Sequence, residues 1–257
     1  MNGTTPDFLE TPSGARLAYH HLPGASPGIV FLGGFQSDMT GTKATTLEAF
    51  AKAQGHAFLR FDYRGHGQSS GMMREGCIGH WKEDALAVVD QLTEGPQVLV
   101  GSSMGGWLAL LVALARPERV CGLVGVAAAP DFTEDLMWDQ FDEQTRTLIL
   151  RDGMYQRPSE YSEEPYVITR TLIEEGRRHL LLRAAVPLQV PVRLLHGMKD
   201  EDVPYTTALR LAERLETEDV RIELFKSGDH RLSGDLELKG LQEQVQELLQ
   251  RSSENLP

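Results

Sequence analysis

The chain has 257 residues, of which 41% are hydrophobic and 24% charged, and its formal net charge is −12. This length suits one large domain with a substantial core. The negative charge argues against nucleic acid or an anionic membrane surface as a partner, since both favour faces rich in Lys and Arg. Two cysteines are too few for a disulfide framework.

The first residues show no targeting segment. Met1 to Asp7 contain neither a basic region nor an apolar stretch, so no signal peptide is visible, and they lack the Arg-rich character of a transit peptide. No stretch approaches about 18 uninterrupted apolar residues, so we expect no transmembrane helix. The default expectation is a cytoplasmic location.

The chain begins with a hairpin signal and continues with short apolar runs. Up to about His21, two alternating segments flank Pro12 to Gly14, which suits an antiparallel hairpin at a sheet edge. Helical patterns separate the later runs. We expect strands at Gly28–Leu32, Ala57–Phe61, Gln97–Val100, Cys121–Ala127, Val190–Leu195 and Val220–Phe225.

The helical patterns have one apolar face each. Trp81, Ala85 and Val88, for example, recur at spacings of three and four. Strands and helices that alternate in this way predict an α/β fold, with a mostly parallel central sheet covered by helices on both faces. We expect helices at Thr42–Ala53, His80–Leu92, Met104–Ala115, Thr206–Glu216 and Leu236–Leu249.

Residues 131–186 interrupt this alternation. They contain no clear strand, but helical patterns occur around Leu136–Leu150 and Val167–Leu182. An insertion of this size inside a compact domain is usually functional. We expect a single domain over residues 1–257, with residues 131–186 as a small helical cap inserted before the strand that carries the catalytic acid.

One serine lies between an expected strand and an expected helix. It is Ser103, in the segment Gly-Ser-Ser-Met-Gly-Gly of residues 101–106. This context predicts a strained turn that exposes the hydroxyl above a helix N-terminus. Side chains at Gly101 or Gly105 would clash where strand and helix converge. We interpret Ser103 as a nucleophile.

The same five-residue pattern occurs a second time, at Gly67–Gly71 around Ser69. The residues that follow have no helical period, so we interpret Ser69 as a loop residue. Such a pattern arises by chance in about one ordinary chain in ten. The strand before Ser103 and the helix after it therefore decide the assignment.

A serine nucleophile needs a base, which a third group orients. In sheets of this kind the chain order is serine, acid, histidine, with the later members at the carboxyl ends of later strands. His230 follows the last expected strand and is the candidate base. His196 ends an earlier strand but precedes the acid, so we interpret it as a structural turn residue.

Three aspartates compete for the role of the acid. Asp200 and Asp202 both follow the strand that ends near Leu195, and Asp131 follows the preceding strand. We favour Asp200 as the carboxylate that holds the imidazole and stabilises its protonated form. Asp202 is the near alternative and Asp131 the more distant one.

The oxyanion of the reaction needs two preorganised donors. The backbone N–H of Met104 follows the nucleophile and is the first candidate. The second is the N–H of Phe35, with Gln36 as the alternative, because Gly33 and Gly34 let this backbone approach the substrate. Gly34 and Gln36 are also candidate substrate contacts.

Together these motifs resemble the α/β hydrolase family over essentially the whole chain. More narrowly, Gly41–Ala44, Phe61–Tyr63 and Asp229–Arg231 resemble a small depalmitoylating branch known from mitochondria. That branch hydrolyses protein thioesters and acyl-glucuronide esters, so the resemblance implies a serine esterase or thioesterase that forms an acyl-enzyme, without fixing its substrate. Other reactions of the same triad, acyl transfer or peptide cleavage, stay open, as does a non-catalytic binding protein with this fold.

Cofactor motifs are weak. Gly65–Gly71 nearly matches a dinucleotide-binding loop, but no helix opens there. The sequence has no histidine pair on a helix face and no Cys-x-x-Cys, so we expect neither a metal nor another cofactor.

The expected cap favours an apolar acyl group. Residues 131–183 carry twelve acidic residues and seven Arg, a net charge of −5. Most apolar cap residues must pack the cap, but some should line the pocket, and Met137, Trp138 and Phe141 are candidates. We expect small-molecule esters or acylated-protein thioesters as substrates, and poor turnover of polyanionic acyl-CoA. The oligomeric state stays open.

Overall fold

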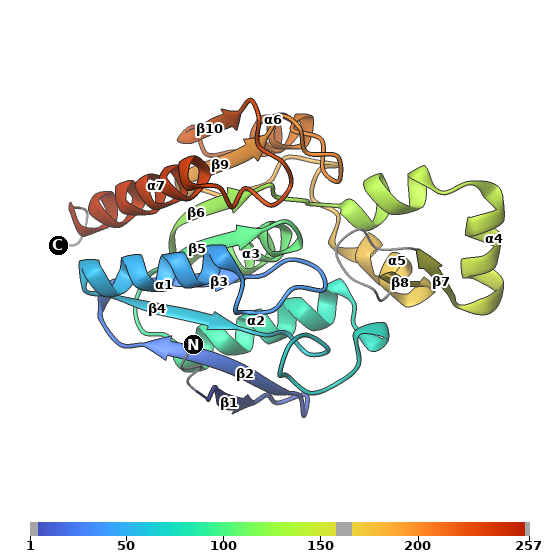
Figure 1. Cartoon of the computed structure of the whole chain (residues 1–257), viewed down its shortest axis with the longest axis horizontal. Helices are drawn as coiled ribbons and strands as arrows, with labels where there is room; N and C mark the ends of the chain where they lie inside the picture. The colour runs from blue at the N-terminus through green and yellow to red at the C-terminus, as the bar shows by residue number, and fades with distance from the viewer. Residues whose placement is uncertain (1–4, 158–165, 255–257) are drawn as a thin grey trace.

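A twisted eight-stranded sheet forms the centre of the computed structural model, which describes residues 5–157 and 166–254 (Figure 1). Its strand order is β1-β2-β4-β3-β5-β6-β9-β10. Pairing is antiparallel from β1 to β2 and from β2 to β4, and parallel elsewhere. The strands are β1 (Asp7–Glu10), β2 (Arg16–Leu22), β3 (Ala25–Leu32), β4 (His56–Phe61), β5 (Gln97–Ser102), β6 (Val120–Val126), β9 (Val192–Gly197) and β10 (Val220–Phe225).

Helices cover both faces of this sheet. On one face α1 (Thr42–Gln54) and α7 (Asp235–Glu254) pack through a shared apolar cluster that includes Leu47, Leu241 and Val245. The other face holds a second cluster with Trp81, Trp107 and Leu211. Those residues lie on α2 (Ile78–Leu92), α3 (Met104–Ala115) and α6 (Thr206–Arg214). The predicted α/β fold is confirmed.

The central strands are buried over their whole length. Every residue of β5 and of β9 is buried, as expected for parallel strands covered on both faces. Arg193 on β9 is buried although it carries a charge, and its guanidinium reaches Glu247 at 2.9 Å and Asp219 at 3.0 Å. These ion pairs compensate the buried charge and connect β9 to α7.

An insertion separates β6 from β9, at the right of Figure 1. It contains α4 (Glu143–Asp152), α5 (Arg170–Gly176) and helical turns at Thr133–Met137, Trp138–Gln140 and Arg177–His179. Further turns in the main body lie at Met73–Glu75 and Pro117–Arg119. Residues 158–165 of the expected cap lie outside the described residues.

The expectation that this insertion has no strand is wrong. β7 (Met154–Arg157) and β8 (Tyr166–Thr169) pair antiparallel, so Val167 begins no helix. Each strand has four residues, which is too short for an alternating pattern to be told from a helical one. In α5 the helix starts only at Arg170, where the Thr169 hydroxyl accepts a hydrogen bond from the Leu172 N–H at 3.0 Å.

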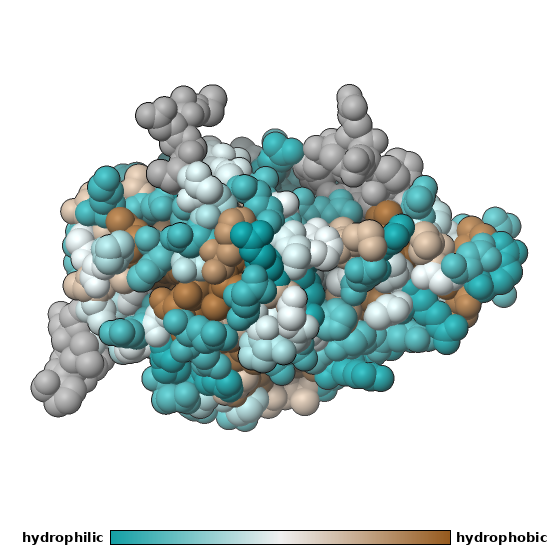
Figure 2. Space-filling model, turned by 90° about the horizontal axis from the view of Figure 1, so that it is seen from below, coloured by the Kyte–Doolittle hydropathy of each residue, from teal (hydrophilic) through white to brown (hydrophobic). Residues whose placement is uncertain are grey.

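Hydrophilic side chains dominate the face of the molecule that Figure 2 shows. Hydrophobic side chains on this face gather mainly over its left half. Within residues 5–157 and 166–254, none of the helices combines the length and the apolar character that a membrane crossing requires.

Candidate active site

Ser103 occupies a sharp turn between β5 and α3. Its backbone has φ 54° and ψ −119°, an unfavourable conformation for a residue with a side chain. Neighbouring glycines make this turn possible, since a Cβ at Gly101 would meet the Gly105 carbonyl and one at Gly105 would meet the Leu32 carbonyl. The predicted clash between strand and helix is therefore confirmed for Gly101, whereas a side chain at Gly105 would clash with the end of β3.

Three side chains from different loops form a continuous hydrogen-bond chain. The Ser103 hydroxyl lies 3.1 Å from Nε2 of His230, and Nδ1 of His230 lies 2.8 Å from Oδ2 of Asp200. Asp200 follows β9 and His230 follows β10, which are neighbours in the sheet. Parallel pairing brings the ends of these strands together with the turn after β5. The three predicted residues thus lie within hydrogen-bond reach of one another.

The side chain of Asp200 is fully buried, and both of its oxygens are engaged. Oδ1 accepts the N–H groups of Val203 at 2.8 Å and Asp202 at 3.0 Å, while Oδ2 faces His230. Burial by itself raises the pKa of Asp200, but hydrogen bonds from His196, His230 and the Val203 N–H hold it well below its usual range. The carboxylate is therefore ionised at neutral pH and suited to face an imidazolium.

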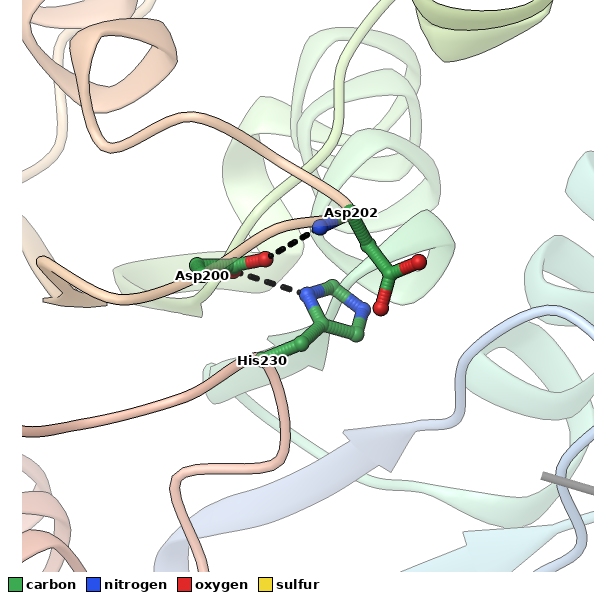
Figure 3. Close-up of side chains that lie close together, drawn as sticks. All are labelled: Asp200, Asp202 and His230. Atoms are coloured by element: carbon green, nitrogen blue, oxygen red, sulfur yellow. Dashed lines mark hydrogen bonds and ion pairs between the residues drawn. The ribbon is translucent and has the colours of Figure 1, made fainter. Parts of the chain in front are cut away.

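The two alternative acids occupy other places. Asp202 is exposed, and its carboxylate lies beside the imidazole, within 4.8 Å of a ring nitrogen of His230 (Figure 3). Asp131 is buried and accepts the N–H groups of Leu181 at 2.7 Å and Leu182 at 2.9 Å. Its carboxylate therefore fastens the end of the insertion to the end of β6.

The loop after β3 runs beside the serine. A Cβ built on Gly34 would lie 3.4 Å from the Cβ of Ser103, so glycine here permits a close approach. Gln36 has φ 56°, and its N–H donates to Nε2 of His66 at 3.2 Å. This contact occupies the Gln36 N–H. Met104 begins α3, where the first N–H groups have no intrahelical acceptor.

His66 supports this loop, a role that the sequence interpretation did not assign. It is buried, and its Nδ1 lies 3.3 Å from the Arg64 carbonyl while Nε2 faces Gln36. Burial lowers the pKa of His66 to about 4, against the opposing hydrogen bond at Arg64. A neutral ring can donate at Nδ1 and accept at Nε2, which matches both contacts.

His196 is a strand residue and not the expected turn residue. It lies in β9, fully buried, with Nε2 2.9 Å from the Val203 carbonyl and 3.3 Å from Oδ2 of Asp200. His196 therefore packs behind the candidate acid on the side away from solvent. The only sequence signal for this contact was its spacing of four residues before Asp200.

The cap candidates lie mainly within the insertion itself. Met137, Trp138 and Phe141 pack against a small cluster of Ile149, Ile168 and Ile173. Of the three candidates, Met137 also packs against the large cluster of the main body. Met137 is thus the candidate whose position connects cap and body.

One group of acidic and histidine side chains in the described ranges has ligand atoms close enough for a metal ion. It consists of Asp200, Asp202 and His230. The hydrogen bonds given above already use both oxygens of Asp200 and Nδ1 of His230. These contacts match a proton-transfer site better than a metal centre.

Comparison with known proteins identifies the family. Residues 29–156 match the family model described as alpha/beta hydrolase fold. A bovine protein named palmitoyl-protein thioesterase ABHD10, mitochondrial, is 44% identical over 97% of this chain and 82% of its own length. The human protein of that name is 43% identical over the same shares. The chain belongs to the α/β hydrolase family.

Solved structures agree with this assignment. Alpha/beta hydrolase domain-containing protein 10 from mouse superposes with a TM-score of 0.90 at 41% identity, covering 96% of this chain and 99% of that one. A putative hydrolase from Agrobacterium vitis S4 gives a TM-score of 0.90 at 38% identity, with 96% and 97% covered. The resemblance to the depalmitoylating branch is therefore shown as well.

The expected cytoplasmic location is wrong. Relatives from five mammals, 42% to 45% identical to this chain, are each named mitochondrial. These names point to mitochondria. The expectation used the lack of a recognisable leader in the first residues and of a long apolar stretch, and neither absence reports where a protein works.

Proposed function

We propose that this α/β hydrolase is a serine thioesterase and esterase that removes apolar acyl groups through an acyl-enzyme. The observation that carries the proposal is the chain of contacts from Ser103 Oγ through His230 to buried Asp200. The names of the ABHD10 relatives support a thioester of an acylated protein as one substrate class. They favour neither the acyl-transfer and peptidase alternatives nor a non-catalytic protein.

In the first half of the reaction Ser103 Oγ attacks the acyl carbon. Nε2 of His230 takes the hydroxyl proton, and Asp200, facing Nδ1 at 2.8 Å, stabilises the imidazolium that forms. The N–H groups of Met104 and Phe35 stabilise the oxyanion, each by about 3 kcal/mol in the transition state. His230 then protonates the leaving thiolate or alkoxide.

Water completes the cycle in the second half. His230 removes a proton from water, which attacks the ester carbonyl of the acylated Ser103. The same two N–H groups stabilise the second oxyanion, and the fatty acid leaves with Ser103 regenerated. No step requires a group outside this chain, the substrate and water.

Apolar side chains of the cap and the adjoining body supply the acyl site in this proposal. Phe35 contacts Trp81 and Phe132, and the centroid of its ring lies 5.8 Å from that of Trp81 and 5.9 Å from that of Phe132. Phe35 directly follows Gly34, whose backbone lies close to Ser103. This aromatic group belongs to the large core cluster that Met137 also contacts. An apolar acyl chain buried there gains about 0.8 kcal/mol per methylene.

A matched substrate panel tests the proposal. An octanoyl group is presented as a thioester, an oxyester and an amide to the wild-type protein and to S103A. We expect the wild type to cleave the thioester and oxyester with a much lower kcat/KM for the amide, and S103A to lose at least about a thousandfold in kcat.

Ser69 provides the control for this panel. Its hydroxyl accepts the Ala18 N–H at 2.8 Å and donates to the Asp62 carbonyl at 2.6 Å, so it stabilises a loop. S69A should therefore keep most of the activity. Equal activity in S103A and wild type, or loss confined to S69A, would contradict the proposal.

A further inference from the structure

A lysine on the first turn of α1 contacts the loop that carries the candidate base. Lys43 is half-buried, and its Nζ donates a hydrogen bond to the carbonyl of Arg231, 188 positions later in the chain. Arg231 directly follows His230. The lysine thus holds the backbone at the residue that follows His230.

This loop has a tight turn with little tolerance for movement. The Asp229 carboxylate accepts the N–H groups of Arg231 at 3.0 Å and Leu232 at 3.2 Å. Leu232 has φ 45°, a strained value for a leucine, and its side chain is buried in the cluster beneath α1 and α7. The N–H groups of Arg231 and Leu232 are therefore both hydrogen-bonded. Lys43 donates to the Arg231 carbonyl, which lies between them in the chain.

Charge reinforces this contact. The Asp229 carboxylate lies close enough to favour the Lys43 ammonium, while Arg231 opposes it. Burial is the largest effect and lowers the pKa of Lys43 to about 8. Removing an amine from water is costly unless it is paired. The Arg231 carbonyl accepts a hydrogen bond from the amine, and the charge of Asp229 favours the ammonium form.

A second contact connects the loop that carries His230 to the loop that carries Asp200. The Lys199 N–H donates to the Gly228 carbonyl at 2.9 Å, which links the loop of His230 to that of Asp200. A Cβ at Gly197 would meet the Gly228 carbonyl, so the two loops are in close contact. Lys43 adds a link to α1, whose preceding loop carries Gly34 and Phe35. The loop that carries His230 is thereby linked both to the loop that carries Asp200 and to α1.

We infer that Lys43 is a positioning residue that sets the distance between His230 and Ser103 through the Arg231 carbonyl. It touches neither substrate nor reacting atoms. The inference rests on the proposed function, because its consequence is measured in the hydrolysis that Ser103 carries out. Displacement of a catalytic group by about 1 Å costs about a hundredfold in rate, so losing this contact should slow chemistry more than binding.

Three variants test the inference with the octanoyl thioester. K43M keeps the aliphatic stem but removes the donor, K43R keeps a charged donor, and K52M removes an exposed lysine from the last turn of the same helix. We expect K43M to lower kcat by about 10- to 100-fold with KM changed less than about threefold. K43R should recover most of the loss, and K52M should match the wild type.

A thermal midpoint measured for each variant separates positioning from folding. If K43M is too unstable to assay, K43Q takes its place, because its amide keeps a neutral donor and should give a smaller loss in kcat. Wild-type kcat in K43M or K43Q, a loss confined to KM, or a loss that K43R does not recover would overturn the inference. A wild-type protein without Ser103-dependent hydrolysis would instead contradict the proposed function.

Discussion

His230 stands between a hydroxyl that must lose a proton and a carboxylate that must stay charged. Nδ1 faces Asp200 Oδ2 at 2.8 Å, so the ring carries its resting proton there and presents Nε2 to Ser103. His196 touches that same Asp200 oxygen at 3.3 Å from the buried side. The carboxylate is thus fixed in position by two rings and two backbone N–H groups.

Exchanging each carboxylate for an amide distinguishes the two neighbouring aspartates. D200N should lower kcat by about 10³- to 10⁴-fold, because the amide cannot hold the imidazole in the required tautomer. D202N should lower it less than tenfold, since an exposed charge within 4.8 Å of the ring contributes about 1 kcal/mol in water. Steady-state kinetics on one ester would measure both, and a loss in D202N as large as that in D200N, or larger, would contradict the assignment of Asp200 as the acid.

The lowered pKa of Asp200 predicts how stability depends on pH. In the folded protein this carboxyl binds fewer protons than in the unfolded chain, so it stabilises the fold above the ordinary Asp pKa of about 4. That contribution is lost as the pH falls through the lowered folded pKa. Urea unfolding of wild type and D200N should therefore differ more in pH dependence below pH 5 than above it.

The wild type should lose about 1 kcal/mol more than D200N between pH 6 and pH 3. The comparison between the two proteins removes the contribution of the other carboxyls, which both share. An identical acid dependence in the two proteins would show that Asp200 is not the stabilised carboxylate that its contacts indicate.

At the scale of elements, the turn between β5 and α3 requires a residue without a side chain at position 105. A Cβ at Gly105 would meet the backbone carbonyls of Leu32 and Gly33, which belong to the end of β3 and the loop after it. G105A should therefore destabilise the protein by at least about 2 kcal/mol.

Gly41 offers a matched control for that substitution. A Cβ there would come no closer than 3.7 Å to its neighbours, and G41A should cost less than about 1 kcal/mol. Urea midpoints of G105A, G41A and wild type give the comparison. Similar midpoints for the two variants would mean that β3 and α3 separate easily, contrary to the packing described.

Elements with long, regular patterns were predictable and short ones were not. α3 begins and ends at the predicted Met104 and Ala115, because nearly all its side chains are apolar and the motif of Ser103 precedes it. The β7–β8 hairpin was missed because its four-residue strands pair with each other and leave no long pattern.

The contacts behind the predicted triad were also not predictable. In the folded protein the buried His66 contacts Gln36, and the buried His196 contacts Asp200. The sequence around these two histidines indicates only a loop and a strand. Asp200 and His230 were predictable from their order along the chain, because the carboxyl ends of parallel strands lie at the same edge of the sheet. The order along the chain could not show that Asp131 accepts hydrogen bonds from residues 181–182. This contact depends on the path that the chain takes from the insertion back to the central sheet.

For the whole molecule, the position of the insertion predicts a preference for apolar acyl chains. For p-nitrophenyl esters of two to sixteen carbons, kcat/KM should rise with chain length until the acyl site is full, by up to about 0.8 kcal/mol per methylene. Neutral octanoyl thioesters should be cleaved faster than octanoyl-CoA, since residues 131–183 carry a net charge of −5. A flat profile, or a preference for the CoA ester, would contradict an apolar site near an acidic cap.

The reaction of the protein with a fluorophosphonate, followed by mass spectrometry, tests the central claim most directly. An activated Ser103 predicts one covalent adduct per chain on the peptide that contains residues 101–106, abolished in S103A and formed much more slowly in H230A. The contacts of Ser69 predict no adduct there. An adduct on another residue, or labelling of S103A at the wild-type rate, would show that Ser103 is not the nucleophile.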